Sequence, residues 1–192
     1  MKSKRWAWLP LLLALPLLAL ACNGDDESAT PLADRGGSLT AEEDLLASMA
    51  LTAQEVREAL SEEVETTLGG PERGERSEGE VARWAQKYES DGGEMVAVDL
   101  RLYETADAAA DRFAKESDPR RDPEHFDVAD VGDEAEGSVS ESSDGRLFTN
   151  AFLRVDKVLV LLAVGPSEEE QRAVLLALAE RLGEKVGVAL EG

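Results

Sequence analysis

The chain has 192 residues, with 20 lysines and arginines against 41 aspartates and glutamates, for a formal net charge of −21. Such an acidic excess argues against binding to nucleic acid and against lying flat on anionic lipid, because like charges repel. The chain contains one cysteine, so no internal disulfide can form, and a folded domain must be stabilised by its core.

The first 21 residues predict a signal peptide. Three basic residues within the first five positions precede an uncharged, mostly apolar stretch over 6–21, which is the order of a charged region and an apolar region in a secretory signal. The stretch is only 16 residues long and carries Pro10 and Pro16, whereas a membrane-spanning helix needs about 20 apolar residues. Removal of the signal would leave 17 basic residues against 41 acidic ones, a net charge of −24.

The end of this stretch carries the cysteine. Leu18-Ala19-Leu20-Ala21-Cys22 resembles the bacterial lipobox, although the commonest form has leucine in place of Ala19. The resemblance implies that the sulfur of Cys22 receives a diacylglyceryl group and that Cys22 becomes the mature amino terminus. Two acyl chains hold a domain at a membrane where one chain would bind only marginally. We therefore expect a protein exported and anchored by lipid to the outer face of a bacterial membrane, either the cell membrane or an outer membrane. The alternative is an ordinary secretory signal that leaves a free thiol.

Residues 22–38 are polar and contain glycine and proline, which predicts a flexible linker behind the acylated cysteine. Residues 39–192 are then expected to form a single globular domain. It should begin with two helices, over 41–49 and 53–61, because Thr40 with Glu43 and Thr52 with Glu55 match the capping box. A charged loop is expected over 69–80.

The middle of the chain changes to a two-residue period. Val96, Val98, Leu100 and Leu102 alternate with other residues, which predicts a strand with these four side chains on one buried face. The preceding run over 80–89 should pair with it, because "SDGG" at 90–93 is a typical hairpin turn.

A helix is predicted over 106–116, capped by Thr105 and with Phe113 directed inward. The following loop, 117–125, contains two prolines, which argues against regular strand pairing there. Next come three strands of a meander, over 131–142, 147–155 and 158–164. The last run is apolar throughout, so it should lie in the centre of a sheet.

The chain should end in a helix over 168–186. Ser167 with Glu170 matches a capping box, and Leu175, Leu178 and Leu182 form an apolar stripe at helical spacing. Strands joined by tight turns imply antiparallel pairing. The expected fold class is therefore α+β, an antiparallel sheet with helices packed on it in two layers or in an α/β/α sandwich.

A weaker resemblance covers about residues 52–188. "DVGDEAEG" leading into "LFTNAFLRVDKVLVLLAV" and a terminal helix resembles small bacterial lipoproteins of the PsbP-like α/β/α sandwich type. The resemblance implies an architecture and a binding or assembly role. It implies no catalytic residue and no cofactor.

Three aromatic residues are the candidate binding residues. Trp84, Tyr88 and Tyr103 would lie near one another in the predicted hairpin, where they could edge a pocket for a ligand or partner. Ordinary packing under a helix is the alternative interpretation.

Little else in the sequence points to chemistry. The sole histidine, His125, would have to serve any Ser-His-Asp mechanism, yet the chain has no nucleophile elbow. One histidine and one cysteine cannot make a usual zinc site. The acidic runs at 25–27, 133–134 and 168–170 lack the spacing of a calcium-binding loop. We predict no catalytic residue, no metal and no cofactor.

Three functions remain open. The first is a lipid-anchored, non-enzymatic domain that binds an envelope protein or a small ligand. The second is a carrier of lipid or another apolar ligand, which would need a cavity between the sheet and the last helix. The third is a hydrolase that uses carboxylates alone, which would need a buried acid with a raised pKa in a cleft.

Overall fold

The structure, a computed structural model, describes residues 38–117, 124–128 and 130–191. The expected signal peptide at 1–21, the lipidation site Cys22 and all but the last residue of the expected linker 22–38 lie outside the described residues. None of the helices in the described ranges is long and apolar enough to cross a membrane.

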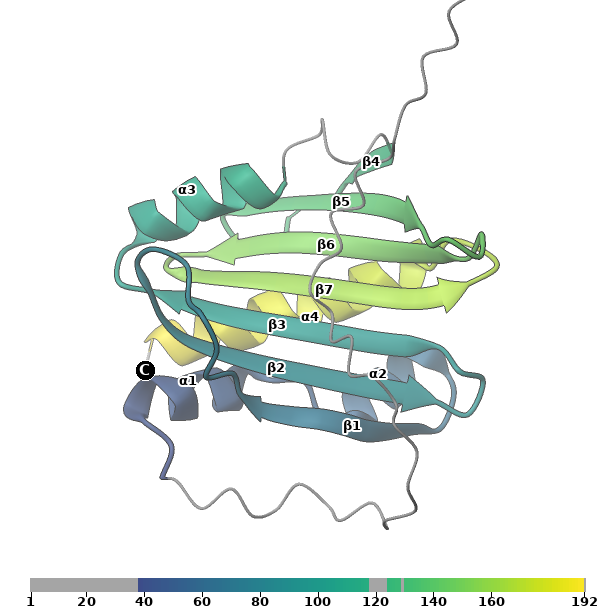
Figure 1. Cartoon of the computed structure of the whole chain (residues 1–192), viewed down its shortest axis with the longest axis horizontal. Coiled ribbons are helices and arrows are strands. Elements are labelled where there is room, and N and C mark those ends of the chain that lie inside the picture. The colour runs from purple at the N-terminus through teal and green to yellow at the C-terminus, as the bar shows by residue number, and fades with distance from the viewer. Residues whose placement is uncertain (1–37, 118–123, 129, 192) are drawn as a thin grey trace, which may run out of the picture. The chain divides into compact units, whose positions relative to one another are not determined.

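A seven-stranded antiparallel sheet forms the centre of the domain (Figure 1). The strands are β1 (Val64–Pro71), β2 (Glu80–Ser90), β3 (Met95–Tyr103), β4 (Glu124–Asp127), β5 (Glu134–Glu141), β6 (Leu147–Val155) and β7 (Val158–Ser167). Their order across the sheet is β1-β2-β3-β7-β6-β5-β4, so the apolar run of β7 is the central strand, as predicted. The expected α+β class is confirmed.

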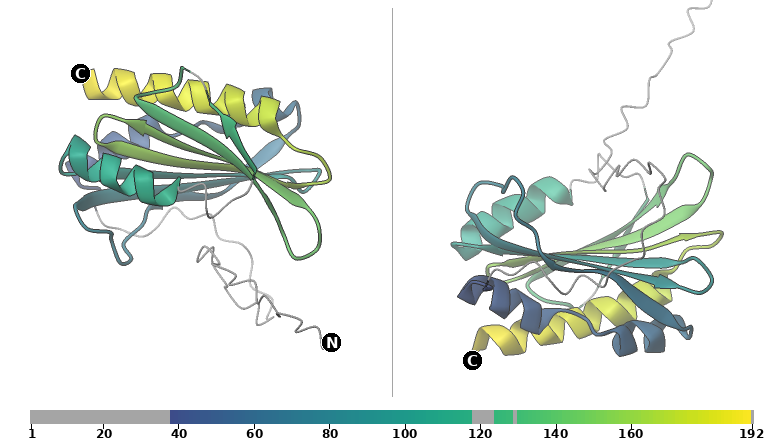
Figure 2. Two further views of the ribbon diagram at one scale, coloured as in Figure 1. Left: turned by 90° about the horizontal axis from the view of Figure 1, so that it is seen from above. Right: turned by 60° about the horizontal axis from the view of Figure 1, so that its bottom comes forward.

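Helices cover both faces of this sheet. They are α1 (Ala41–Met49), α2 (Ala53–Leu60), α3 (Ala106–Glu116) and α4 (Arg172–Glu191). Figure 2 shows α1, α2 and α4 on one side of the sheet and α3 on the other. The period of β7 explains this arrangement, because Val160 and Leu162 face α4 whereas Leu159 packs with Phe113 of α3. The layers are therefore α/β/α.

The core between α4 and the sheet is filled by aliphatic side chains. Leu175, Leu178 and Leu182 of α4 are 0 to 1% exposed, and so are Val160 and Leu162 of β7. These side chains belong to one continuous cluster. The predicted apolar stripe of the last helix is confirmed, and each such leucine contributes about 1.5–3 kcal/mol by burial.

The two amino-terminal helices start where their caps predict. The amide of Thr40 donates to Glu43 Oε2 at 3.0 Å, and the amide of Glu43 donates to Thr40 Oγ1 at 3.2 Å. Thr52 and Glu55 repeat this reciprocal arrangement at the start of α2. Each box satisfies two amides that the first turn of a helix leaves without partners.

Strand β1 was not predicted. The sequence favoured a loop over 69–80, but Gly69, Gly70 and Pro71 pair with Gln86, Ala85 and Trp84. The pairing contains an irregularity between Thr66 and Leu68, which interrupts the two-residue period of burial. The strand lies at the sheet edge, where glycine and proline are tolerated.

Strand β4 corrects a second prediction. The prolines in 117–125 argued against pairing, yet Glu124 lies opposite Val139 and His125 lies opposite Ser138 of β5. The prolines do not prevent this, because β4 begins after the last of them and borders only β5. A strand of four residues is too short to produce a clear period.

The start of α4 corrects a third prediction. Ser167 is not a helix cap, because it ends β7 and its hydroxyl donates to the carbonyl of Glu169. The helix begins four residues later than the sequence indicated, at Arg172 instead of 168. Thr149 of β6 accepts the amide of Gln171 at 2.9 Å. The glutamates at 168–170 therefore lie in a loop rather than in the first helical turn.

Candidate functional site

The three candidate aromatic residues do not form one patch. Trp84 and Tyr88 lie on the face of the sheet that α1, α2 and α4 cover, and both belong to or pack against the main core. Tyr103 lies on the opposite face, in the cluster with Phe113 and Leu159. The two-residue period of β3 already indicated this separation. Tyr103 follows Leu102 in the strand, so its side chain points to the opposite face.

The two tyrosines are buried. Tyr88 is 1% exposed and its hydroxyl donates to the carbonyl of Leu51. Burial, and next the charge of Glu55, raise the pKa of Tyr88 to about 12, so it stays neutral at physiological pH. Tyr103 is 0% exposed, with its hydroxyl 3.0 Å from Ser77 Oγ. Trp84 is partly exposed, and its buried Nε1 has no hydrogen-bond partner.

His125 is held at the sheet edge. Its Nδ1 lies 2.6 Å from Glu136 Oε1, which makes an ion pair only when the imidazole is protonated. Its Nε2 is buried and has no hydrogen-bond partner. Ser138 lies opposite His125 in the register of β4 and β5, and the contact with Glu136 is a pairing between the same two strands.

The acidic residues of the described part of the chain are numerous but do not cluster with histidine or cysteine as metal ligands. No group of three or more histidine, cysteine, aspartate or glutamate side chains there could hold a metal ion. Burial, and next the charge of Glu62, raise the pKa of Glu94. Glu94 lies in a hairpin and accepts from Gln171 Nε2 at 3.0 Å, which is a structural contact.

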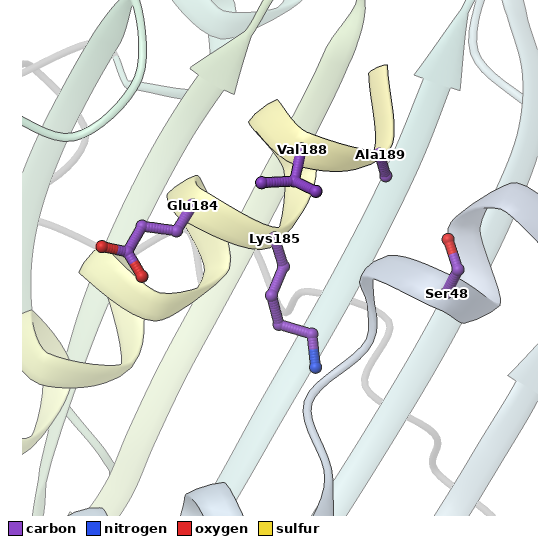
Figure 3. Close-up of a pocket in the computed structure, with 5 residues that line it drawn as sticks. All are labelled: Ser48, Glu184, Lys185, Val188 and Ala189. Atoms are coloured by element: carbon purple, nitrogen blue, oxygen red, sulfur yellow. The ribbon is translucent and has the colours of Figure 1, made fainter. Parts of the chain in front are cut away.

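A shallow groove lies between α1 and α4 (Figure 3). Its volume is about 440 Å³, and it is lined by Ser48, Glu184, Lys185, Val188 and Ala189. Lys185 Nζ is already bound to Glu55 Oε2 at 3.0 Å. The groove lies between two helices, whereas the carrier hypothesis needs a cavity between α4 and the sheet. The filled core there gives no support to a carrier role.

On the other face, a network of ion pairs ties α3 to the sheet. Asp99 accepts from Arg83 Nε at 2.8 Å and from Arg101 Nη2 at 2.7 Å, and Arg101 Nη1 reaches Glu116 of α3 at 3.3 Å. Burial alone would lower the pKa of Arg101, but the charges of Asp99 and Glu116 outweigh it and raise the pKa. The network therefore pairs charges of the sheet with a charge of α3.

Beyond α3, no helix of the described residues covers the rest of this face. Helix α3 packs on Leu159, with Phe152 and Leu161 at its border, and Figure 1 shows the other half of the sheet facing the viewer with no helix in front of it. The side chains that point outward there are partly exposed. We call this surface the open half-face; it consists of Lys87, Met95, Ala97, Phe148, Asn150 and Ala163.

The open half-face was not found from the sequence. Its members come from four strands and meet only through the register, in which Lys87 opposes Ala97, Ala97 opposes Ala163, and Ala163 opposes Asn150. The two-residue period of β3 could have indicated part of it, because the side chain of Ala97 points to the face opposite the buried Val96 and Val98. What remained unknown was that α3 would cover only one end of this face.

No protein-family model and no curated protein matches the chain. Among solved structures, the fold is similar to the extracellular domain of PknH from Mycobacterium tuberculosis, with a TM-score of 0.56 and 15% sequence identity. The match covers 76% of this chain and 96% of that domain. At this identity the likeness shows a shared fold.

Proposed function

We propose that the chain is an exported lipoprotein, anchored at the outer face of a bacterial membrane through Cys22, whose α+β domain binds a protein partner without catalysis. The lipobox resemblance at Leu18–Cys22 supports the anchor. The similarity to an extracellular bacterial domain is consistent with export. The binding role rests on one observation, the open half-face, because partly exposed apolar side chains on a sheet without a covering helix are typical of an interaction surface.

The anchor is tested with Cys22→Ala in the full chain, expressed in a bacterial host. The variant cannot receive a diacylglyceryl group, so we expect it to leave the detergent phase of a Triton X-114 partition, where the parent chain should remain. Ser28→Ala, in the same linker, is the matched control and should partition like the parent. Detergent-phase partition of Cys22→Ala, or an unmodified Cys22 in mass spectra of the mature parent, would refute the anchor.

The binding role is tested separately in intact cells. A photo-crosslinking residue in place of Ala97 on the open half-face should give a discrete adduct of higher mass. The same residue in place of Glu180, on the exposed side of α4, should give none. Equal labelling from both positions, or none from position 97, would count against a partner at this surface.

A further inference from the structure

Like charges oppose each other at one border of the open half-face. Glu65 of β1 lies directly opposite Glu89 of β2, and both are exposed. Their sequence neighbours Val64 and Ser90 are buried toward the helices, so the two carboxylates point to the open side. Opposed side chains on paired strands have Cβ atoms about 4.5–5.5 Å apart, and like charges in this position are destabilising. Neither carboxylate has an ion-pair partner among the described residues.

A second opposed pair lies at the other edge of the sheet and nearer to α3, because Glu136 lies opposite Phe152 at the border of that helix. Asp127 of β4 lies directly opposite Glu136 of β5. These two carboxylates also point to the open side, because the intervening Phe126 packs with the main core. The nearby His125 compensates Glu136 only in its protonated form. Two opposed acidic pairs thus lie on the same face of the sheet, at its two edges and in different rows.

Between the two borders the surface is mostly apolar or small. Met95 lies opposite Glu89, and Gly165 lies opposite Met95. In the next row Ala97 and Ala163 are paired. The one basic side chain of the open half-face is Lys87, because Arg83 and Arg101 are bound to Asp99. An apolar centre with a charged rim is the usual anatomy of a protein interface.

The spacing of the strands gives the dimensions of a matching partner. The midpoints of the two acidic pairs are separated by five strand intervals, or about 24 Å at 4.8 Å for each interval. They are also displaced by four residues along the strands, because the first pair shares a row with Gly165 and the second with Leu161, which is about 13 Å in the perpendicular direction. The two pairs therefore lie about 27 Å apart. A helix that crosses the strands obliquely would span this distance with about 18 residues. Basic side chains at its two ends would reach the acidic pairs while its apolar side covers the centre.

We propose that the open half-face docks a protein partner through an amphipathic helix with an apolar centre and basic residues at both ends. The proposal rests on the proposed function of the domain as a binding module, and it adds the chemistry of the partner. The charge argument favours this partner over a second copy of the chain, because two copies with a net charge of −21 each would repel. In this proposal the opposed carboxylates destabilise the free domain locally, and the basic residues of the partner remove that repulsion on binding.

The probe is a fluorescent synthetic helix of about 18 residues, with leucines in the centre and lysines at both ends, titrated with the full chain in neutral detergent. Glu65→Gln with Glu89→Gln should weaken binding about tenfold. Glu180→Gln with Glu184→Gln, on the exposed side of α4, removes the same charge and should leave binding nearly unchanged. Because the first pair of changes removes a repulsion, the free energy of unfolding should stay equal or rise, so weaker binding would not reflect unfolding.

A second pair of variants tests the apolar centre. Met95→Lys should abolish binding of the probe, and Val188→Lys, at the groove of α1 and α4, is the matched control because Val188 is 73% exposed. The proposal is overturned if the two glutamine pairs weaken binding equally, if Val188→Lys has the larger effect, or if a probe with glutamates at its ends binds as well. Absence of binding to the lysine probe also overturns it. An adduct at position 97 in cells together with such a failure would leave the binding role intact and reject only the partner's chemistry.

Discussion

Gly132 shows how a single residue fixes the position of a connection. It has a φ of +69°, and a Cβ placed on it would lie 2.5 Å from the carbonyl oxygen of Arg154. The next residue uses this closeness, since the amide of Asp133 donates to the same oxygen at 2.8 Å. A glycine is therefore required both for its conformation and for the lack of a side chain.

We predict that Gly132→Ala destabilises the domain by about 2–4 kcal/mol, which combines the left-handed conformation with a clash against backbone. Gly93→Ala is the control, because Gly93 has a φ of +82° but nothing within 4 Å of its Cβ position. It should cost only about 1–2 kcal/mol. Urea unfolding of both variants measures the difference, and equal losses would show that the contact with Arg154 has no energetic weight.

At the level of elements, the sequence predicted those whose signals are local. Caps at Thr40, Thr52 and Thr105 lie within a few residues of the amides they satisfy. The run of aliphatic residues in β7 indicates by its composition alone that the strand is buried. The edge strands β1 and β4 have no such signal, because they are held by pairing with residues distant in the chain. The start of α4 was wrong for the same reason, since its partner Thr149 belongs to another strand.

The attachment of α3 gives a prediction for one element. Arg101 is 6% exposed and joins Asp99 of the sheet to Glu116 of α3. In Arg101→Ala, Asp99 keeps its pair with Arg83, and Glu116 keeps its pair with Arg112. We therefore expect the free energy of unfolding to fall by about 2–4 kcal/mol, which is less than the full cost of leaving a buried charge without a partner.

Hydrogen exchange distinguishes a local from a general effect. Amides of α3 should exchange faster in Arg101→Ala than those of α4, which packs on the opposite face. Arg146→Ala removes an exposed pair with Asp144 and should change stability by about 0–1 kcal/mol. Uniform acceleration in all helices would mean that the network supports the whole sheet instead of holding α3.

The charge of the whole molecule couples its stability to its proposed partner. A chain with a net charge of −21 repels itself, and the two opposed pairs of carboxylates at the edges of the sheet add to this repulsion locally. A basic partner would lower this energy on binding. Salt would imitate part of that effect by screening, and it would weaken the binding itself.

We predict that raising sodium chloride from low to moderate concentration at neutral pH increases the melting temperature of the full chain, by about 2–4 °C for each kcal/mol of screened repulsion. Buried pairs such as Arg101 with Asp99 are screened less than exposed carboxylates, so they should not reverse the sign. Near pH 4.3, the isoelectric point, the net charge vanishes and the same salt should have little effect. Calorimetry at both pH values measures this contrast. A melting temperature that falls with salt at neutral pH would mean that attractive ion pairs outweigh the repulsion. The opposed carboxylates would then not destabilise the free domain, and a basic partner would have no repulsion to remove.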